Sequence, residues 1–136
     1  MICETGSATT RDLPQALARA DHVLSSGRTV VIDGSFRSRA HREAARAVAA
    51  RHRVPFRFVE CQAELDACRH RLEERARNRS LSDGRLAIFD EFIARFEPVT
   101  ELAGGDHLRV HTTRPIEENL ERLRRVLPAW PEGLVG

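Results

Sequence analysis

The stretch Gly27-Arg28-Thr29-Val30-Val31-Ile32-Asp33-Gly34-Ser35-Phe36 decides the fold. It contains a run of β-branched residues that ends in one acid and a glycine. A continuous apolar run bounded by glycine is typical of a strand that is buried on both faces of a parallel sheet. We therefore expect a strand at residues 29–33, with Asp33 at its carboxyl end, where open α/β sheets bind their ligands.

Helical and strand patterns alternate on either side of this strand. Apolar residues repeat with a period of about 3.6 residues over 12–25, and small residues form one face over 37–53. Two more short strands are predicted at 56–60 and 108–112. Because strands that alternate with helices favour a parallel sheet, the fold class is α/β. The remaining helices are expected at 64–79, 83–96 and 116–127.

The chain is predicted to be a single domain. Its 136 residues suffice for one hydrophobic core, and no shift in composition marks a boundary. The small, polar residues 1–11 are expected to be a loose lead-in, and the Pro- and Gly-rich residues 128–136 a loose tail. Residues 64–97 form an arginine-rich helical region between the second and third predicted strands.

The sequence contains no lysine, so all 22 basic residues are arginine. This absence excludes from these residues every mechanism that needs a lysine amine, such as a Schiff base or a phosphate-loop lysine. The net charge of +2 gives no argument for nucleic acid, and the arginine-rich helix lacks interleaved aromatic residues. We therefore do not expect a nucleic-acid partner.

The sequence shows no pattern for export or membrane insertion. No apolar run approaches the ~20 residues that span a bilayer. Met1 is not followed by the basic and apolar regions of a signal peptide. We expect a cytoplasmic protein that has no membrane partner.

Asp33 is the first candidate for chemistry. An acid at the end of a buried strand can hold a metal-bound water or orient a hydroxyl group. Its carboxylate can equally cap the following turn, and both interpretations stay open. No metal ligand set is expected, because the spacing of Cys61, Cys68 and His70 matches no common zinc pattern.

A second candidate is the row of Arg71, Arg75 and Arg79. These residues are four apart, so they lie along one helix face. Arginine's planar guanidinium matches the oxygens of a phosphate, and the row would serve as a phosphate clamp. The alternative is a solvated helix face without a ligand, which the sequence favours in the absence of other signals.

Taken together, these segments resemble a known family. The sequences GRTVVIDGSFRSRAHREAARAVAARHRVPFRFVEC (27–61) and RHRLEERARNRSLSDGRLAIFDEFIARFEP (69–98) are similar to small P-loop kinases of the zeta-toxin, polynucleotide-kinase and gluconate-kinase-like type. These proteins are often labelled AAA-family ATPases. In that group a VVVDATF-like strand precedes an RRAHREAAR-like helix, and an arginine-bearing lid follows. The resemblance extends over about residues 12–127.

The resemblance implies roles for individual residues. It places Asp33 near the phosphoryl acceptor, and Arg71, Arg75 and Arg79 at the transferring phosphate as catalytic lid residues. ATP and Mg²⁺ are the cofactors of the intact family, whose members transfer the γ-phosphate to a small hydroxyl-bearing acceptor. The implied acceptor-binding residues are Ser35, Phe36 and Arg39, and the implied adenine-pocket residues are Thr113 and Arg114.

The chain departs from this family at the phosphate-binding loop. No Gly-x-x-x-x-Gly-Lys-[Ser/Thr] motif occurs, and no lysine is present to replace it. The resemblance therefore implies an incomplete three-layer sheet with three strands, five main helices and no central phosphate-loop strand. A gap should separate the strands at 29–33 and 56–60, or the two should pair directly. A second polypeptide could supply the missing strand, or the chain could form a homo-oligomer.

Two functions follow from the resemblance. The first is the carboxyl-terminal part of a P-loop kinase, which is inactive and binds neither ATP nor Mg²⁺ as an isolated chain. The second is a non-catalytic kinase remnant that acts as an interaction module or as an anion- or nucleotide-binding module.

Overall fold

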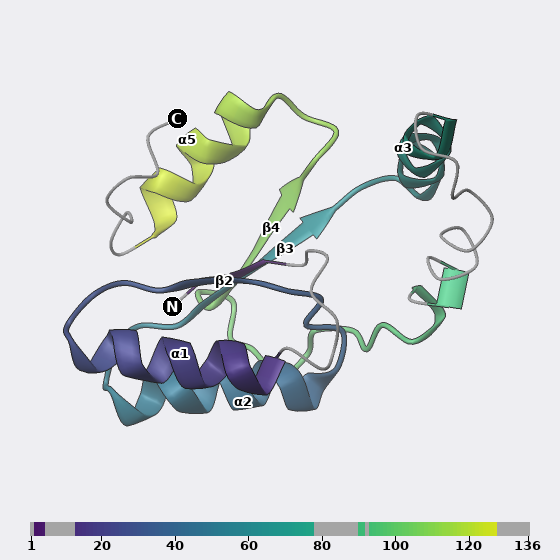
Figure 1. Cartoon of the computed structure of the whole chain (residues 1–136). Helices are drawn as coiled ribbons and strands as arrows, with labels where there is room; N and C mark the ends of the chain where they lie inside the picture. Colours follow the sequence, from purple (N-terminus) through teal and green to yellow (C-terminus); the bar gives the residue numbers. More distant parts are fainter. Residues whose placement is uncertain (1, 5–12, 78–89, 92, 128–136) are drawn as a thin grey trace.

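The fold was analysed in a computed structural model that describes residues 2–4, 13–77, 90–91 and 93–127 (Figure 1). Helical residues at 90–91 and 93–94 belong to the helix predicted at 83–96, most of which lies outside the described residues. The named elements are β1 (Ile2–Glu4), α1 (Leu13–Ser25), β2 (Val31–Asp33), α2 (Arg39–Arg51), β3 (Arg57–Gln62), α3 (Leu65–Arg77), β4 (His107–His111) and α5 (Ile116–Val126).

The strands form one parallel sheet with the order β2-β1-β3-β4. This arrangement confirms the predicted α/β class and the parallel sheet. The three predicted strands are present with small shifts of their ends. The strand predicted at 29–33 begins two residues later, and the strand predicted at 56–60 extends to Gln62.

The prediction of a missing central strand is wrong. Strand β1 lies between β2 and β3, and its middle residue Cys3 pairs with Ile32 on one side and with Phe58 on the other. Neither a gap nor direct pairing of β2 with β3 is present. Ile2–Glu4 is therefore not part of a loose lead-in, because backbone pairing on both sides holds this short segment in the sheet.

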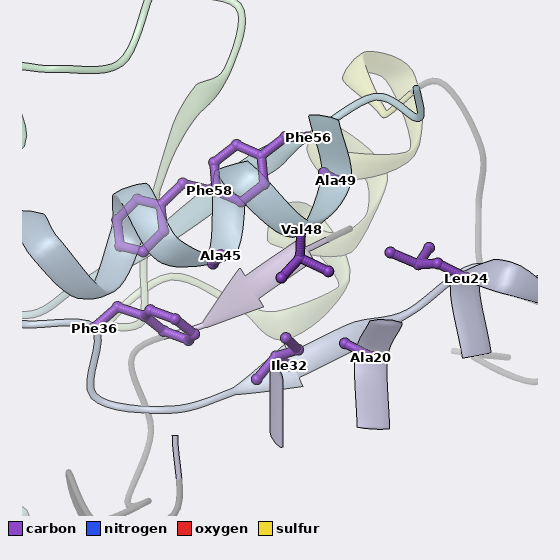
Figure 2. Close-up of a cluster of buried hydrophobic side chains, with 9 residues drawn as sticks. All are labelled: Ala20, Leu24, Ile32, Phe36, Ala45, Val48, Ala49, Phe56 and Phe58. Atoms are coloured by element: carbon purple, nitrogen blue, oxygen red, sulfur yellow. The ribbon is translucent and has the colours of Figure 1, made fainter. Parts of the chain in front are cut away.

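The larger hydrophobic core lies between the sheet and the helices α1 and α2, which run side by side along one face of the sheet (Figure 1). Ile32 points into this core, whereas its strand neighbours Val31 and Asp33 are exposed, which is the alternation expected of a strand. Figure 2 shows the members of the core: Ala20, Leu24, Ile32, Phe36, Ala45, Val48, Ala49, Phe56 and Phe58.

A smaller core lies on the opposite face of the sheet. Val59 of β3 and Val110 of β4 pack against Leu123 of α5. Helix α5 therefore covers the β3–β4 side of this face, whereas α1 and α2 cover the other face (Figure 1). Because β3 alternates between the two cores, Phe58 and Val59 are both buried, and the result is a three-layer arrangement.

Local sequence signals set the ends of the helices that flank β2. Gly27 follows α1 with φ of +76°, a conformation that favours glycine after a helix. Ser38 caps α2, since its side-chain oxygen accepts a hydrogen bond from the backbone N–H of His41. None of the helices in the described ranges has the length and apolar character needed to cross a membrane.

Candidate functional site

Asp33 and Ser35 lie where the sequence predicted, at the carboxyl edge of the sheet. Asp33 ends β2, is exposed, and is in register with Glu4 of the central strand β1. Its side chain forms no hydrogen bond or ion pair with another described residue. Ser35 lies half-buried in the loop between β2 and α2. The Asp33 carboxylate is therefore accessible for a ligand and is not used to cap the turn within the described part of the chain.

Phe36 follows on the same loop and Arg39 begins α2, and the two differ in exposure. The Phe36 side chain is 1% exposed and meets the Phe58 ring edge-to-face at 6.2 Å, so it packs the core. Arg39 is exposed and forms an ion pair of 2.7 Å with Glu43 on α2. Their assignment to an acceptor site stays a prediction, and the burial of Phe36 favours a structural role for its ring.

The arginine row starts on α3, beyond the carboxyl ends of β3 and β4 (Figure 1). Arg71 is exposed and donates to the Thr112 hydroxyl at 3.1 Å and to the Thr112 carbonyl at 2.9 Å. Arg75 lies on the same helix, and Arg79 lies outside the described residues. Arg71 therefore holds α3 against the turn that follows β4.

The predicted adenine-pocket residues lie beside this contact. Thr113 is exposed in the turn after β4, next to the Thr112 that Arg71 binds. Arg114 is also exposed and pairs with Glu118 at 2.7 Å. The fold thus brings Arg71 near Thr113 and Arg114, although Arg71 lies about 40 residues before them in the sequence.

The fold does not bring Arg71 next to Asp33. Asp33 ends β2 at one edge of the sheet, whereas Arg71 contacts the turn after β4 at the other edge. Neighbouring strands lie about 4.8 Å apart, so three strand spacings separate the two positions by roughly 14 Å or more. The site therefore consists of two parts on the same edge, one after β2 and one after β4.

A buried arginine that sequence reasoning missed organises the part after β2. The Arg42 guanidinium on α2 has a side-chain exposure of 0%, and its Nε lies 2.5 Å from Oε1 of Glu101. Its Nη1 donates to the Phe36 carbonyl at 2.9 Å, and Nη2 lies 3.4 Å from the Pro98 carbonyl. The group also lies over the rings of Phe58 and Phe96, at 5.9 and 5.8 Å from their centroids.

Through this ion pair and the ring contacts of the guanidinium, α2 is joined to residues 96–101 and to β3, which are distant from it in the sequence. Burial acts to raise the pKa of Glu101, but the hydrogen bond and charge of Arg42 outweigh burial and hold that pKa below its usual value. Glu101 is thus ionised at neutral pH and neutralises the buried guanidinium. The only sequence signal was an arginine on the small-residue face of α2, and nothing indicated its partner 59 residues away.

A cavity of about 610 Å³ lies next to this ion pair. One wall is the β2–α2 loop and the first turn of α2, and the other is the segment 94–98. The backbone N–H of Glu97 donates to the Arg37 carbonyl at 2.8 Å, and the N–H of Arg39 donates to Oε2 of Glu97 at 2.6 Å. The lining residues are Arg37, Ser38, His41, Ala94, Arg95, Phe96, Glu97 and Pro98.

A second polar cluster lies on β3 and β4. Oε2 of Glu60 lies 2.6 Å from Nε2 of His107 and 3.4 Å from Nε of Arg109, while Gln62 donates to Oε1 at 3.1 Å. Burial acts to raise the pKa of Glu60, but the hydrogen bonds from Gln62 and His107 outweigh burial. The pKa of Glu60 is therefore below its usual value. The Glu60 carboxylate is thus bound by Gln62 of its own strand and by His107 and Arg109 of β4. This arrangement points to a role in joining the two strands.

The residues that the structure describes do not form a recognisable site for ATP and Mg²⁺. The sequence has no lysine for the phosphates, Arg71 is engaged with Thr112, and Arg114 is engaged with Glu118. In the described residues no three side chains of His, Cys, Asp or Glu come together as a metal site. We therefore derive no catalytic step through either group.

Comparison with known proteins identifies the family over most of the chain. The model of a family described as "AAA domain" matches residues 4–99. This range begins at the last residue of β1 and includes β2, α2, β3 and α3. Neither the search of curated proteins nor the search of solved structures found a match.

Proposed function

The chain belongs to the AAA domain family of P-loop NTPase-like proteins, and from this premise we propose that it is the carboxyl-terminal part of a P-loop kinase. Enzymes of that class transfer the γ-phosphate of ATP, and their catalysis consists mainly of positioning and charge neutralisation. We propose a small hydroxyl-bearing acceptor, as in kinases of the zeta-toxin, polynucleotide-kinase and gluconate-kinase-like type. The chain by itself is inactive in this proposal, because no lysine-bearing loop holds the phosphates.

One observation carries the proposal: an exposed acid ends a strand that pairs with the central strand of a parallel sheet. Asp33 lies at the carboxyl edge, in register with Glu4, the last residue of β1. A carboxylate in this place can orient an acceptor hydroxyl or a metal-bound water. The loop after a central strand is also where P-loop proteins bind phosphates, and here the connection 5–12 follows that strand.

The sequence of that connection explains why the scaffold is incomplete. Residues 5–12 read Thr-Gly-Ser-Ala-Thr-Thr-Arg-Asp and have the same length as the motif Gly-x-x-x-x-Gly-Lys-[Ser/Thr]. In this register both glycines, the lysine and the final hydroxyl residue are absent, because Thr5, Thr10, Arg11 and Asp12 occupy those positions. In this proposal a functional loop requires a second polypeptide or another segment of the same protein whose strand takes the place of β1. The DNA upstream of the Met1 codon tests these two sources, since the motif would lie in frame or in a neighbouring reading frame.

Titration calorimetry with MgATP tests the proposal. The native chain should give no saturable heat, whereas a variant in which residues 5–12 are replaced by Gly-x-x-x-x-Gly-Lys-Thr should bind MgATP. Low-micromolar binding by the native chain would contradict the incompleteness of its phosphate site. Equal absence of binding in a folded variant would contradict the equivalence of β1 and a phosphate-loop strand.

A non-catalytic anion-binding module is the second candidate function. It is favoured by the cavity beside α2, which is lined by Arg37 and His41 from one segment and by Arg95 from the other. This candidate needs no ATP site. It predicts that the native chain binds a small anion in the absence of MgATP. It also predicts no phosphotransferase activity, whether or not an upstream segment or a neighbouring reading frame supplies a phosphate-binding loop.

A further inference from the structure

The cavity beside the amino end of α2 has walls that are held in place by buried contacts. Its two walls come from residues 37–41 and 94–98, which are joined by the hydrogen bonds between Glu97 and the backbone of Arg37 and Arg39. Beside them, the fully buried Arg42 donates to the carbonyl of Phe36, which precedes the first segment, and to that of Pro98 in the second. The cavity is therefore a fixed feature of the fold and does not depend on exposed side chains alone.

The lining of this cavity is basic on both sides. Arg37 comes from the loop after β2, and Arg95 comes from the segment on the opposite wall. The Arg95 partner is Glu91 at 2.7 Å, but both side chains of that pair are more than half exposed, so the pair is weak and an anion can recruit Arg95. Arginines that line a cavity from two sides suit a phosphate, whose oxygens accept hydrogen bonds in several directions.

The remaining lining residues suit a hydroxylated molecule. Ser38 offers a hydroxyl group, and Phe96 and Pro98 offer an apolar wall for a carbon skeleton. The one carboxylate among the lining residues, Glu97, is held by the backbone N–H of Arg39 at 2.6 Å. The amino end of α2 is thus already capped by Ser38 and Glu97, and the binding argument depends on the side chains of Arg37 and Arg95. A volume of about 610 Å³ accommodates a small molecule.

We propose that this cavity binds the phosphate group of a small, hydroxylated phosphate ester, which is the acceptor of the proposed kinase. The assignment rests on the proposed function, since Arg37 follows Asp33, the last residue of β2, by four residues. In this proposal a molecule anchored by its phosphate at Arg37 and Arg95 extends toward Asp33 and Ser35. The substrate class is therefore a phosphorylated polyol or sugar. The reaction transfers the γ-phosphate of ATP to one of its hydroxyl groups, which loses its proton, and ADP leaves.

The test is a titration of the native, ¹⁵N-labelled chain with ribose 5-phosphate, followed by amide chemical shifts. Inorganic phosphate and ribose are titrated in parallel. The proposal predicts saturable shifts at residues 37–41 and 94–98 with ribose 5-phosphate, weaker binding of inorganic phosphate and none of ribose. Affinity should fall as ionic strength rises. Absence of saturable shifts with ribose 5-phosphate would overturn the proposal, and so would shifts confined to other residues.

Charge-matched variants separate this site from general attraction of anions. Arg37→Gln should weaken binding of ribose 5-phosphate about tenfold or more, because a charge-assisted hydrogen bond is lost. Arg95→Gln gives a second variant on the other wall and should act in the same direction. The control is Arg46→Gln, an exposed arginine of α2 that does not line the cavity, which should change binding less than twofold.

The variants also define what would refute the assignment. Equal weakening by Arg37→Gln and Arg46→Gln would show that net charge alone attracts the anion. These titrations need no ATP. If ribose 5-phosphate does not bind but the MgATP calorimetry gives the expected results, only the acceptor class is rejected. Binding of ribose 5-phosphate together with failure of the MgATP variant would keep the cavity as a phosphate site and reject the kinase role.

Discussion

Replacing Glu101 by alanine should be among the most damaging single changes outside the hydrophobic core. The substitution removes the carboxylate that neutralises Arg42, whose side chain is 0% exposed. Among the described residues, only the Phe36 and Pro98 carbonyls, at 2.9 and 3.4 Å, would then accept hydrogen bonds from the guanidinium. Loss of one partner from a buried ion pair costs about 3–5 kcal/mol, because the remaining charge stays buried without compensation.

The structure places this change toward the lower end of that range. The rings of Phe58 and Phe96 lie within 6 Å of the guanidinium carbon and partly stabilise the orphaned cation. We therefore expect a loss of about 3 kcal/mol in the free energy of unfolding, a large part of the ~5–15 kcal/mol typical of a native domain. Urea denaturation followed by helical circular dichroism measures it.

A matched control exists on the same helix. Glu43→Ala breaks the pair between Arg39 and Glu43, in which both side chains are at least half exposed, and should leave the unfolding midpoint nearly unchanged. A double replacement, Arg42→Met with Glu101→Leu, should recover much of the lost stability, because no charge remains buried. Equal effects of Glu101→Ala and Glu43→Ala would refute the inference that Arg42 organises this part of the fold.

Three further predictions concern stability. The pKa values of Glu60 and Glu101 are lowered in the folded state, so both carboxylates stabilise the fold above the ordinary value of 4.5, and this stability is lost as pH falls through the folded pKa values. Thermal melts from pH 7 to pH 3 should therefore show melting temperatures that fall below pH 4.5. A flat profile would contradict this. Phe36→Ala should cost about 3–5 kcal/mol in urea denaturation, whereas Val31→Ala, at a 40% exposed position, should cost much less; similar losses would show that Phe36 is not part of the core. Asp33→Asn should leave stability within about 0.5 kcal/mol of the native chain, since the carboxylate is exposed and bonds to no other described residue; a larger loss would indicate a structural role.

The sequence predicted the fold class and most of the elements because their signals are local. The apolar run before Asp33 specifies a strand, and Ser38 and Gly27 specify helix ends through their own backbone contacts. Strand β1 was missed for a physical reason. Three residues carry too little periodicity to reveal a strand, and their pairing depends on two neighbours that lie far along the chain.

Within the candidate site, the sequence predicted only positions that follow from a local pattern. Asp33 could be placed at the carboxyl edge of the sheet from the strand pattern alone. The pairing of Arg42 with Glu101 and the cavity between residues 37–41 and 94–98 depend on a contact across the intervening strands and helices, which periodicity does not encode. The row of arginines was visible, but the engagement of Arg71 by Thr112 was not.

The central claim is that β1 occupies the middle of the parallel sheet of this AAA-family domain, and cross-strand nuclear Overhauser effects test it most directly. We predict contacts from the backbone of Cys3 to both Ile32 and Phe58, as the parallel register requires. Direct backbone contacts between Ile32 and Phe58, with none from Cys3, would show that β2 and β3 pair without β1 and would contradict the account.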